Sequence, residues 1–397
     1  MGHFVPHTDA EIDAMLGFLG LASLDDLFAH IPEAVRLASG LALPRGEAEA
    51  DVLSTLGELA GRNIAPERDL VCFAGGGAYE HEIPSAVRSL ASRSELVTSY
   101  TPYQPELAQG VLQALFEYQT MLCAITGMEV ANASLYDAAS SAVEGVNLAA
   151  AATGRKLVHV SRGVHPHVRA VMHTFAAGSG LEIVEAPLHD GVTRWPDDVG
   201  EPAALVLAYP NYLGCLEDVP TAADRAHDRG ALLVAQADPV AAGLLRSVGA
   251  LGADVAVGEG QPFGTPLSFG GPYVGLFACK EAPYVRRWLP GRVTGETVDA
   301  EGRRAYVLTL STREQHIRRA EASSNVCTNQ TLIAITAAIH MAWLGTSGLR
   351  ELALRCARGA RYARDALSLI PGVQPAVSAA SLYELAISVP LDPDVLL

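Results

Sequence analysis

Apolar side chains recur at helical spacing through about the first 65 residues. Thr8 and Glu11 have the spacing of a capping box, which marks the start of a helix. A second stretch, residues 23–32, repeats the pattern with Ser23 as its cap. We therefore predict an N-terminal helical arm, residues 1–66, that packs on a larger body. The apolar face expected for its first helix consists of Ile12, Met15, Leu16 and Leu19.

Between residues 155 and 280, six short apolar runs alternate with helical stretches. Their unbroken apolar character is typical of strands that are buried on both faces of a mostly parallel sheet. The pattern predicts an α/β fold, with helices flanking the sheet, over a large domain of residues 67–330. The predicted strands are 156–161, 182–188, 203–210, 231–238, 253–258 and 273–279.

Two further segments frame this domain. Residues 102–127 predict a long helix, with Pro105 at its start and Gly127 as its stop. After residue 330 the pattern is again helical, and it ends in a strand-like run at 382–389. We predict a small C-terminal domain, 331–397, that is incomplete as the chain stands.

Composition narrows the function classes. The net charge of −16 argues against a nucleic-acid binder, which needs a basic surface. No CxxC pair and no metal-ligand cluster accompany the six cysteines, so we expect reduced thiols and no metal site. No run of about 18 apolar residues and no signal peptide is visible, so we expect a cytoplasmic protein without a membrane span.

Three polar features lie where an open α/β sheet binds its ligands, at the carboxyl ends of the strands. Ser140 and Ser141 open a helix of small residues, which suits either an ordinary helix start or an anion seat. Asp238 ends a buried strand ahead of Pro239. It could hold the ring nitrogen of pyridoxal phosphate or cap a helix, and the sequence leaves both open.

The third feature is Gln261, in the glycine-rich segment after the strand at 253–258. Pyridoxal phosphate enzymes of this architecture carry a reactive lysine in this region, and a carboxamide cannot replace its amine. The chain has two lysines, Lys156 and Lys280, and both are expected at the surface. Arginine cannot serve instead, because its guanidinium stays protonated.

Histidines and loop aromatics complete the candidates. His165 and His167, with His173 nearby, are interpreted as packing residues because no carboxylate or cysteine cluster accompanies them. Residues 79–84 and 98–106 are rich in Tyr, His and Gln on loops. Loop side chains of this kind either bind a ligand or partner or are simply solvated.

Several long segments resemble one family. They are "FAGGGAYEHEIP", "TSYTPYQPELAQGVLQALFEYQT", "YPNYLGCLED", "SFGGPYVGLFA", "PGRVTGETVD" and "LTLSTREQHIRRAEASSNVCTNQ". Together they resemble glycine dehydrogenase (decarboxylating) subunit 1, the alpha subunit of the split P-protein of the glycine cleavage system. The resemblance runs over the whole chain. It implies a fold type I pyridoxal phosphate architecture and an α2β2 assembly.

The resemblance also implies a division of labour. The family decarboxylates glycine and transfers the aminomethyl group to the lipoyl arm of H-protein. The beta subunit carries the cofactor and its lysine, and Gln261 stands at or within one residue of the lysine position. Ser140, Ser141 and Asp238 are then vestigial or act in trans. Residues expected near the alpha–beta interface are Tyr79, His81, Tyr100, Thr101, Tyr103, Gln104 and Asn325.

One departure and two alternatives accompany this interpretation. Family members usually continue for some tens of residues past "PLDPDVLL", which is why the C-terminal domain is expected to be truncated. The first alternative is a self-sufficient pyridoxal phosphate enzyme that uses Lys280. The second is a non-enzymatic scaffold or regulator of the same fold.

Overall fold

A computed structural model describes residues 6–37, 41–64, 69, 71, 75–97, 102–281 and 287–392. The chain divides into two compact units, Met1–Cys72 and Phe73–Leu397, and each is described by itself. The three-part division expected from the sequence, at 1–66, 67–330 and 331–397, stays a prediction.

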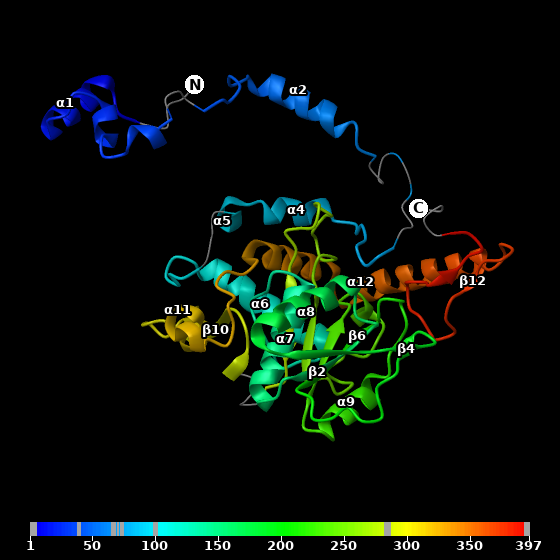
Figure 1. Cartoon of the computed structure of the whole chain (residues 1–397). Helices are drawn as coiled ribbons and strands as arrows, with labels where there is room; N and C mark the ends of the chain where they lie inside the picture. Colours follow the sequence, from blue (N-terminus) through cyan, green and yellow to red (C-terminus); the bar gives the residue numbers. More distant parts are fainter. Residues whose placement is uncertain are drawn as a thin grey trace. The chain divides into compact units, whose positions relative to one another are not determined.

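The first unit opens with the predicted capped helix. This helix is α1 (Asp9–Leu19), labelled in Figure 1. The N–H of Thr8 donates to Glu11 Oε2 over 2.7 Å, and the N–H of Glu11 donates to Thr8 Oγ1 over 3.4 Å. The capping box is therefore confirmed. The unit also contains η1 (Leu24–Phe28), η2 (Glu33–Val35) and α2 (Glu49–Ala60).

The second predicted helix, over 23–32, is wrong in type and length. Its first half is the five-residue 3₁₀ helix η1, and Asp26 accepts the N–H groups of Ala22 and Ser23 at 2.9 and 2.8 Å. This closed local turn satisfies the helix start within a few residues. Pro32 then interrupts the chain, because proline has no N–H to continue a helix.

The apolar face of the first unit stays uncovered within that unit. Of its described apolar residues, Leu16 is the one that is buried. Phe18 on α1 is 91% exposed, and the apolar side of α2 is exposed in the same way. An amphipathic helix gains most of its stability from burying such a face. The apolar residues of α2 that lie exposed are Val52, Leu53, Leu56 and Leu59.

A seven-stranded sheet in the order β1-β9-β8-β7-β6-β2-β3 forms the centre of the second unit. The five strands from β8 to β3 run parallel, whereas β9 is antiparallel to β8 and to β1. All six predicted strands are present, so the mostly parallel α/β fold is confirmed. The strands are β1 (Val130–Ala131), β2 (Leu157–Ser161), β3 (Glu182–Ala186), β6 (Ala204–Tyr209), β7 (Leu232–Ala237), β8 (Val255–Glu259) and β9 (Gly275–Cys279).

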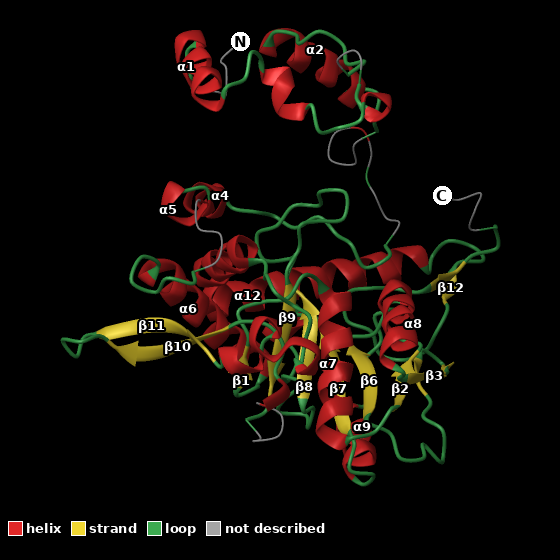
Figure 2. Ribbon diagram, turned by 60° about the vertical axis from the view of Figure 1, so that its left-hand side comes forward, coloured by secondary structure: helices red, strands yellow, loops and turns green. Residues whose placement is uncertain are grey.

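Helices cover both faces of this sheet (Figure 2). Because side chains alternate along a strand, Val206 and Val234 face one layer while Leu205 and Leu233 face the other. One layer holds α7 (Ala138–Thr153) and α8 (Pro166–Ser179). The opposite layer holds α6 (Gln109–Thr126), α9 (Val219–His227) and part of α12 (Thr331–Leu367).

Helix α6 agrees with its prediction at one end and differs at the other. Helix α6 ends as expected, with Gly127 in the left-handed conformation, but it begins at Gln109 rather than at Pro105, which lies in the preceding turn.

By length and composition, α12 is a described helix that could cross a membrane. Its buried small residues, among them Ala334 and Ala338, instead contact the core beside α6, as expected of a core helix.

Smaller elements surround the sheet. A hairpin of β10 (Val293–Val298) and β11 (Arg304–Thr309) projects from the body of the unit, on the left of Figure 2. The predicted C-terminal strand is shorter than expected. Only Ile387–Ser388 (β13) pairs there, with Gln374–Pro375 (β12). The other described helices and strands of this unit are α4 (Ser85–Ala91), α5 (Ser94–Val97), β4 (Leu188–His189), β5 (Val192–Thr193), η3 (Ala241–Gly243), η4 (Ser311–Arg313), α11 (Gln315–Arg318) and η5 (Arg319–Glu321).

Candidate functional site

The carboxyl ends of β6, β7 and β8 open onto a cavity of about 490 Å³. Parallel strands present their carboxyl ends at one edge of a sheet, which is where open α/β folds bind ligands. The wall of the cavity is completed by the loop at 77–82, by the second half of α12 and by residues 383–384. We call this space the crevice.

Gln261 lies on the crevice floor, two residues after the end of β8, and is only 5% exposed. Its side-chain Nε2 donates to the carbonyl oxygen of Thr265 over 2.6 Å. A carbonyl can only accept, so this bond fixes which end of the amide is nitrogen. The carboxamide is therefore held within its own turn.

Glu259 fills the position where a helix start could receive an anion. Its Oε2 accepts the N–H of Ala138, the first residue of α7, over 3.1 Å. Its Oε1 accepts the N–H groups of Gln261 and Val274 at 3.0 and 3.2 Å. Burial raises the pKa of this carboxyl to about 7. The chain's own carboxylate thus occupies the positive end of α7.

Asp238 bonds the turn that follows β7 and is not the N-cap of a helix, because η3 begins at Ala241 with Val240 as its N-cap. Its Oδ1 accepts the N–H groups of Val240 and Ala241 at 2.8 and 3.0 Å. The carboxylate also lines the crevice, next to the Tyr383 side chain. Burial, followed by this neighbouring carboxylate, raises the pKa of the Tyr383 hydroxyl.

A glycine-rich loop brings Tyr79 and His81 over the crevice. Gly75, Gly76 and Gly77 all have positive φ, and a Cβ on Gly77 would lie 2.9 Å from the ring of His165. The hydroxyl of Tyr79 accepts the N–H of Gly77 and donates to Glu384. Burial lowers the pKa of His81, although the nearby Asp238 carboxylate opposes that shift.

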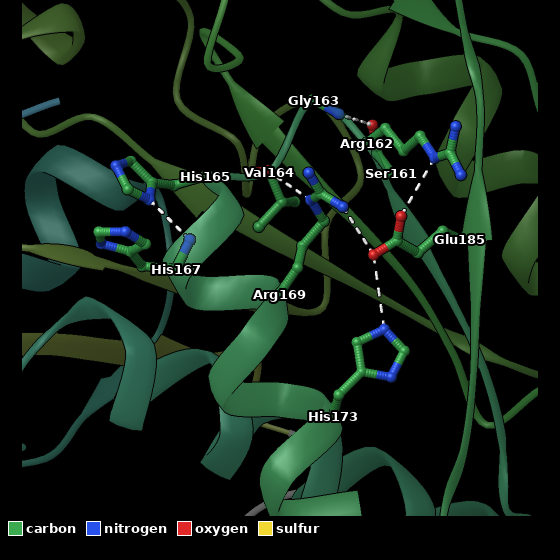
Figure 3. Close-up of polar contacts among 9 residues, drawn as sticks. All are labelled: Ser161, Arg162, Gly163, Val164, His165, His167, Arg169, His173 and Glu185. Carbon is green, nitrogen blue, oxygen red and sulfur yellow. Dashed lines mark hydrogen bonds and ion pairs between the residues drawn. The ribbon is translucent and has the colours of Figure 1, made fainter. Parts of the chain in front are cut away.

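His165, the N-cap of α8, anchors this loop. Figure 3 shows its contact with the N–H of His167. Its Nδ1 accepts the N–H of His167 over 3.1 Å, so its Nε2 carries the proton and donates to the carbonyl oxygen of Gly76 over 2.8 Å. His173 instead lies 3.4 Å from Glu185, which also pairs with Arg169. The three histidines therefore do not converge, and the described residues hold no cluster of three metal-binding side chains.

The remaining predicted residues lie apart from the crevice. Ser141 is fully buried against Gly275, and its hydroxyl has no hydrogen-bond partner among the described residues. Ser140 donates its N–H to Asp137, the cap of α7, over 2.7 Å. Tyr100 and Thr101 lie outside the described residues.

Tyr103 and Asn325 also lie outside the crevice. Buried Arg292 donates to the Tyr103 hydroxyl over 2.6 Å and to the carbonyl oxygen of Cys327 over 2.9 Å. Gln104, beside Tyr103, is exposed. Asn325 lines a separate cavity of about 590 Å³ together with Glu144, whose pKa burial raises to about 7. The predicted residues therefore do not gather at one place, since Tyr103 contacts Arg292 whereas Asn325 lines a separate cavity.

Both lysines lie at the opposite edge of the sheet. Lys156 precedes β2 and is exposed. Lys280 follows the antiparallel strand β9, and its Nζ contacts the carbonyl oxygen of Gly252 at 3.2 Å and Asp254 at 3.5 Å, ahead of β8. Lys280 is therefore separated from Gln261 by the length of β8, which removes it as a reactive amine of the crevice.

These observations test whether the crevice fits pyridoxal phosphate. No lysine or arginine lines it among the described residues, Gln261 replaces the amine, and Glu259 occupies the helix start that would receive a phosphate. The residues present do not fit the cofactor. Sequence reasoning missed Glu259 and Glu384, although Glu259 directly follows a predicted strand end, where ligand-binding groups gather.

Comparisons with known proteins agree with this architecture. The family model described as "Glycine cleavage system P-protein" matches residues 2–387. The probable glycine dehydrogenase (decarboxylating) subunit 1 of Desulforamulus reducens is 48% identical over 375 residues, which cover 94% of this chain and 83% of the relative. Its counterpart from Moorella thermoacetica is 47% identical and covers 98% of this chain and 87% of the relative.

Solved structures give the same result. A crystal structure of glycine decarboxylase, the P-protein of the glycine cleavage system, in inhibitor-bound form has a TM-score of 0.93 and 47% identity, covering 100% of this chain and 89% of that one. The glutamate decarboxylase of Lactobacillus brevis has a TM-score of 0.65 at 12% identity, covering 90% and 82%. That distant likeness concerns the fold alone, and it confirms the predicted fold type I architecture. The chain belongs to the glycine cleavage system P-protein family.

Proposed function

We propose that this chain is the subunit of glycine dehydrogenase (decarboxylating) that supports the reaction without holding the cofactor. The crevice carries this proposal: Gln261 stands where an amine is needed, and Glu259 closes the anion seat of α7. Pyridoxal phosphate and its lysine then belong to a beta subunit, in an α2β2 assembly. The aminomethyl group released from glycine passes to the lipoyl arm of H-protein, in the cytoplasm.

Two features support a partner subunit. The relatives carry the name "subunit 1". The apolar faces of α1 and α2 are exposed within their own unit, although such faces are stable when another surface covers them. We propose that the beta subunit covers them.

The chain contributes to catalysis by shaping the partner's pocket. Arg292 joins Tyr103 to the carbonyl oxygen of Cys327, two residues after Asn325, and so holds Tyr103 against that turn. Tyr79 is held by Glu384, and the glycine loop that carries it is held by His165. A rigid surface positions side chains for a partner at low entropic cost. The residues proposed to act in trans are Tyr79, His81, Tyr100, Thr101, Tyr103, Gln104 and Asn325.

Reductive trapping tests the proposal. The chain is co-purified with its beta subunit, supplied with pyridoxal phosphate, reduced with borohydride and mapped by mass spectrometry. We expect the pyridoxyl label on the beta subunit alone. A label on Lys280 or Lys156 would mean that this chain holds the cofactor after all.

Activity provides the second arm of the test. Glycine–bicarbonate exchange is measured with the chain, the beta subunit and lipoylated H-protein, together and with each omitted. We expect exchange only when all three are present. Full exchange without this chain would leave it as a scaffold or regulator outside the reaction.

A further inference from the structure

Carboxyl groups line the crevice of this chain, and no lysine or arginine lines it within the part of the chain that the structure describes. Asp238, Glu259 and Glu384 face it, with Glu80 and Glu82 exposed at its rim. The positively chargeable side chains that line it, among the described residues, are the imidazoles of His81 and His165. His165 is already a neutral donor to Gly76, and burial favours the neutral form of His81.

Gln261 adds an independent observation. The side chain is almost completely buried, and its bond to Thr265 fixes Nε2 on the protein side. Its Oε1 accepts no hydrogen bond from the described residues, and the side chain lines the crevice. One further oxygen atom on a crevice residue, Gln236 Oε1, is buried and has no hydrogen-bond partner among those residues. Buried polar atoms of this kind normally have a partner.

The missing partner must be a donor. An anionic ligand would meet three carboxylates without a compensating cation, whereas an ammonium group offers several N–H donors and a positive charge. A metal ion is a weaker match, because the described residues include no group of three carboxylate, histidine or cysteine side chains spaced to share one. A cavity of about 490 Å³ holds a ligand of several non-hydrogen atoms.

We propose that the crevice binds a small organic ammonium ion, with Asp238, Glu384 and the Gln261 carbonyl oxygen as its acceptors. The proposal is independent of the proposed function, since it concerns a ligand held by this chain alone. It means that the crevice of this chain has the opposite charge preference from a phosphate-binding pocket of the same fold.

The test measures binding of three matched probes to the full-length chain by isothermal titration calorimetry or ligand-observed NMR. The probes are ethylammonium, neutral ethanol and anionic acetate, at pH 8 and constant ionic strength. We expect ethylammonium to bind at least about tenfold more tightly than either of the others. Equal binding of ethanol, or tighter binding of acetate or pyridoxal phosphate, would overturn the proposal.

Two variants assign the binding to the crevice. Asp238→Asn keeps the oxygen that caps Val240 and Ala241, and Glu384→Gln keeps an acceptor for Tyr79. Each removes one negative charge, so each should weaken ethylammonium binding by about tenfold or more. Asp224→Asn, on the exposed face of α9, removes the same charge elsewhere and should leave binding unchanged.

Further outcomes decide between sources of the signal. Circular dichroism checks that each variant is folded, and Glu384→Gln alone decides if Asp238→Asn is not. Wild-type affinity in both crevice variants would place the ligand elsewhere and refute the assignment. Complete competition by potassium or magnesium ions at millimolar concentration would identify an inorganic cation site instead.

Discussion

Strand β8 has a carboxylate near each end, Asp254 just before it and Glu259 as its last residue, in opposite surroundings. Asp254 accepts the N–H of Leu233 at 2.9 Å, and it lies 2.8 Å from His227 and 3.5 Å from Lys280. Glu259 is bonded by three backbone N–H groups and has no cationic partner among the described residues. Burial without a counter-charge raises its pKa to about 7.

The difference separates a structural edge of the sheet from a functional one. At the amino edge, the buried Asp254 pairs with Lys280 and bonds His227, as is usual where only stability matters. At the carboxyl edge, three acids share a cavity without such neutralisation, a cost that folds tolerate at ligand sites. The sheet therefore carries Lys280 at its amino edge, away from the crevice. Asp238 and Glu259 lie at the carboxyl edge, where a ligand can bind.

The largest effect is expected at the amino edge. Asp254→Ala leaves the N–H of Leu233 and the Lys280 ammonium without this acceptor, so the free energy of unfolding should fall by about 3 kcal/mol. Lys280→Ala should cost less than about 1 kcal/mol, because this side chain is 37% exposed. Urea denaturation measures both. Equal losses would contradict the argument that the buried Asp254 contributes more to stability than the partly exposed Lys280 does.

The second effect is a pH dependence at the carboxyl edge. The folded protein holds the Glu259 proton more tightly than the unfolded chain does, because the pKa rises from 4.5 to about 7. This group therefore lowers the free energy of unfolding as pH rises from about 4.5 to 7, by up to about 1.4 kcal/mol per pH unit. Its effect becomes constant only above about pH 8, where the carboxyl is ionised in both states.

Glu259→Gln tests this slope, since glutamine does not titrate. Denaturation series at several pH values should show a shallower fall in the variant between about pH 5 and 7. Glu144 and Glu384, whose pKa values burial also raises to about 7, keep their share of the slope. An unchanged slope in Glu259→Gln would contradict the burial argument.

A smaller effect is expected in the loop above the crevice. Gly76→Ala and Gly77→Ala both place a side chain at positive φ, but only the Cβ on Gly77 meets His165, at 2.9 Å. Gly77→Ala should therefore cost about 1 kcal/mol more than Gly76→Ala. Thermal unfolding gives the comparison. Equal losses of stability in the two variants would show that the His165 side chain moves away from the new Cβ without strain.

The substitution Gln261→Lys is expected to have the smallest effect. Gln261→Lys places an amine at the carboxyl edge, where Asp238 and Glu384 hold it as an ammonium and Glu259 still closes the start of α7. Pyridoxal phosphate added to this variant should produce no imine absorbance near the visible range. A stable imine band would show that one substitution restores the site and that Glu259 is no obstacle.

Much of the fold was predictable from local pattern. The six strands, the capping box at Thr8 and Glu11, and the stop at Gly127 all depend on interactions within a few residues. Residues 23–32 were misassigned because a closed turn around Asp26 competes with a longer helix. Helix type over such short segments depends on these local hydrogen bonds more than on apolar spacing.

The absence of a lysine at the expected position follows from the sequence alone. The chain has two lysines, Lys156 and Lys280, and Gln261 stands at that position. The place where the carboxyl groups come together follows from the fold and not from the sequence pattern. Glu259, Asp238 and Glu384 come from two strand ends and a segment more than a hundred residues away, and they share one crevice because parallel strands end at the same edge. Strand direction also decided the place of Lys280, since the antiparallel β9 carries it to the opposite edge.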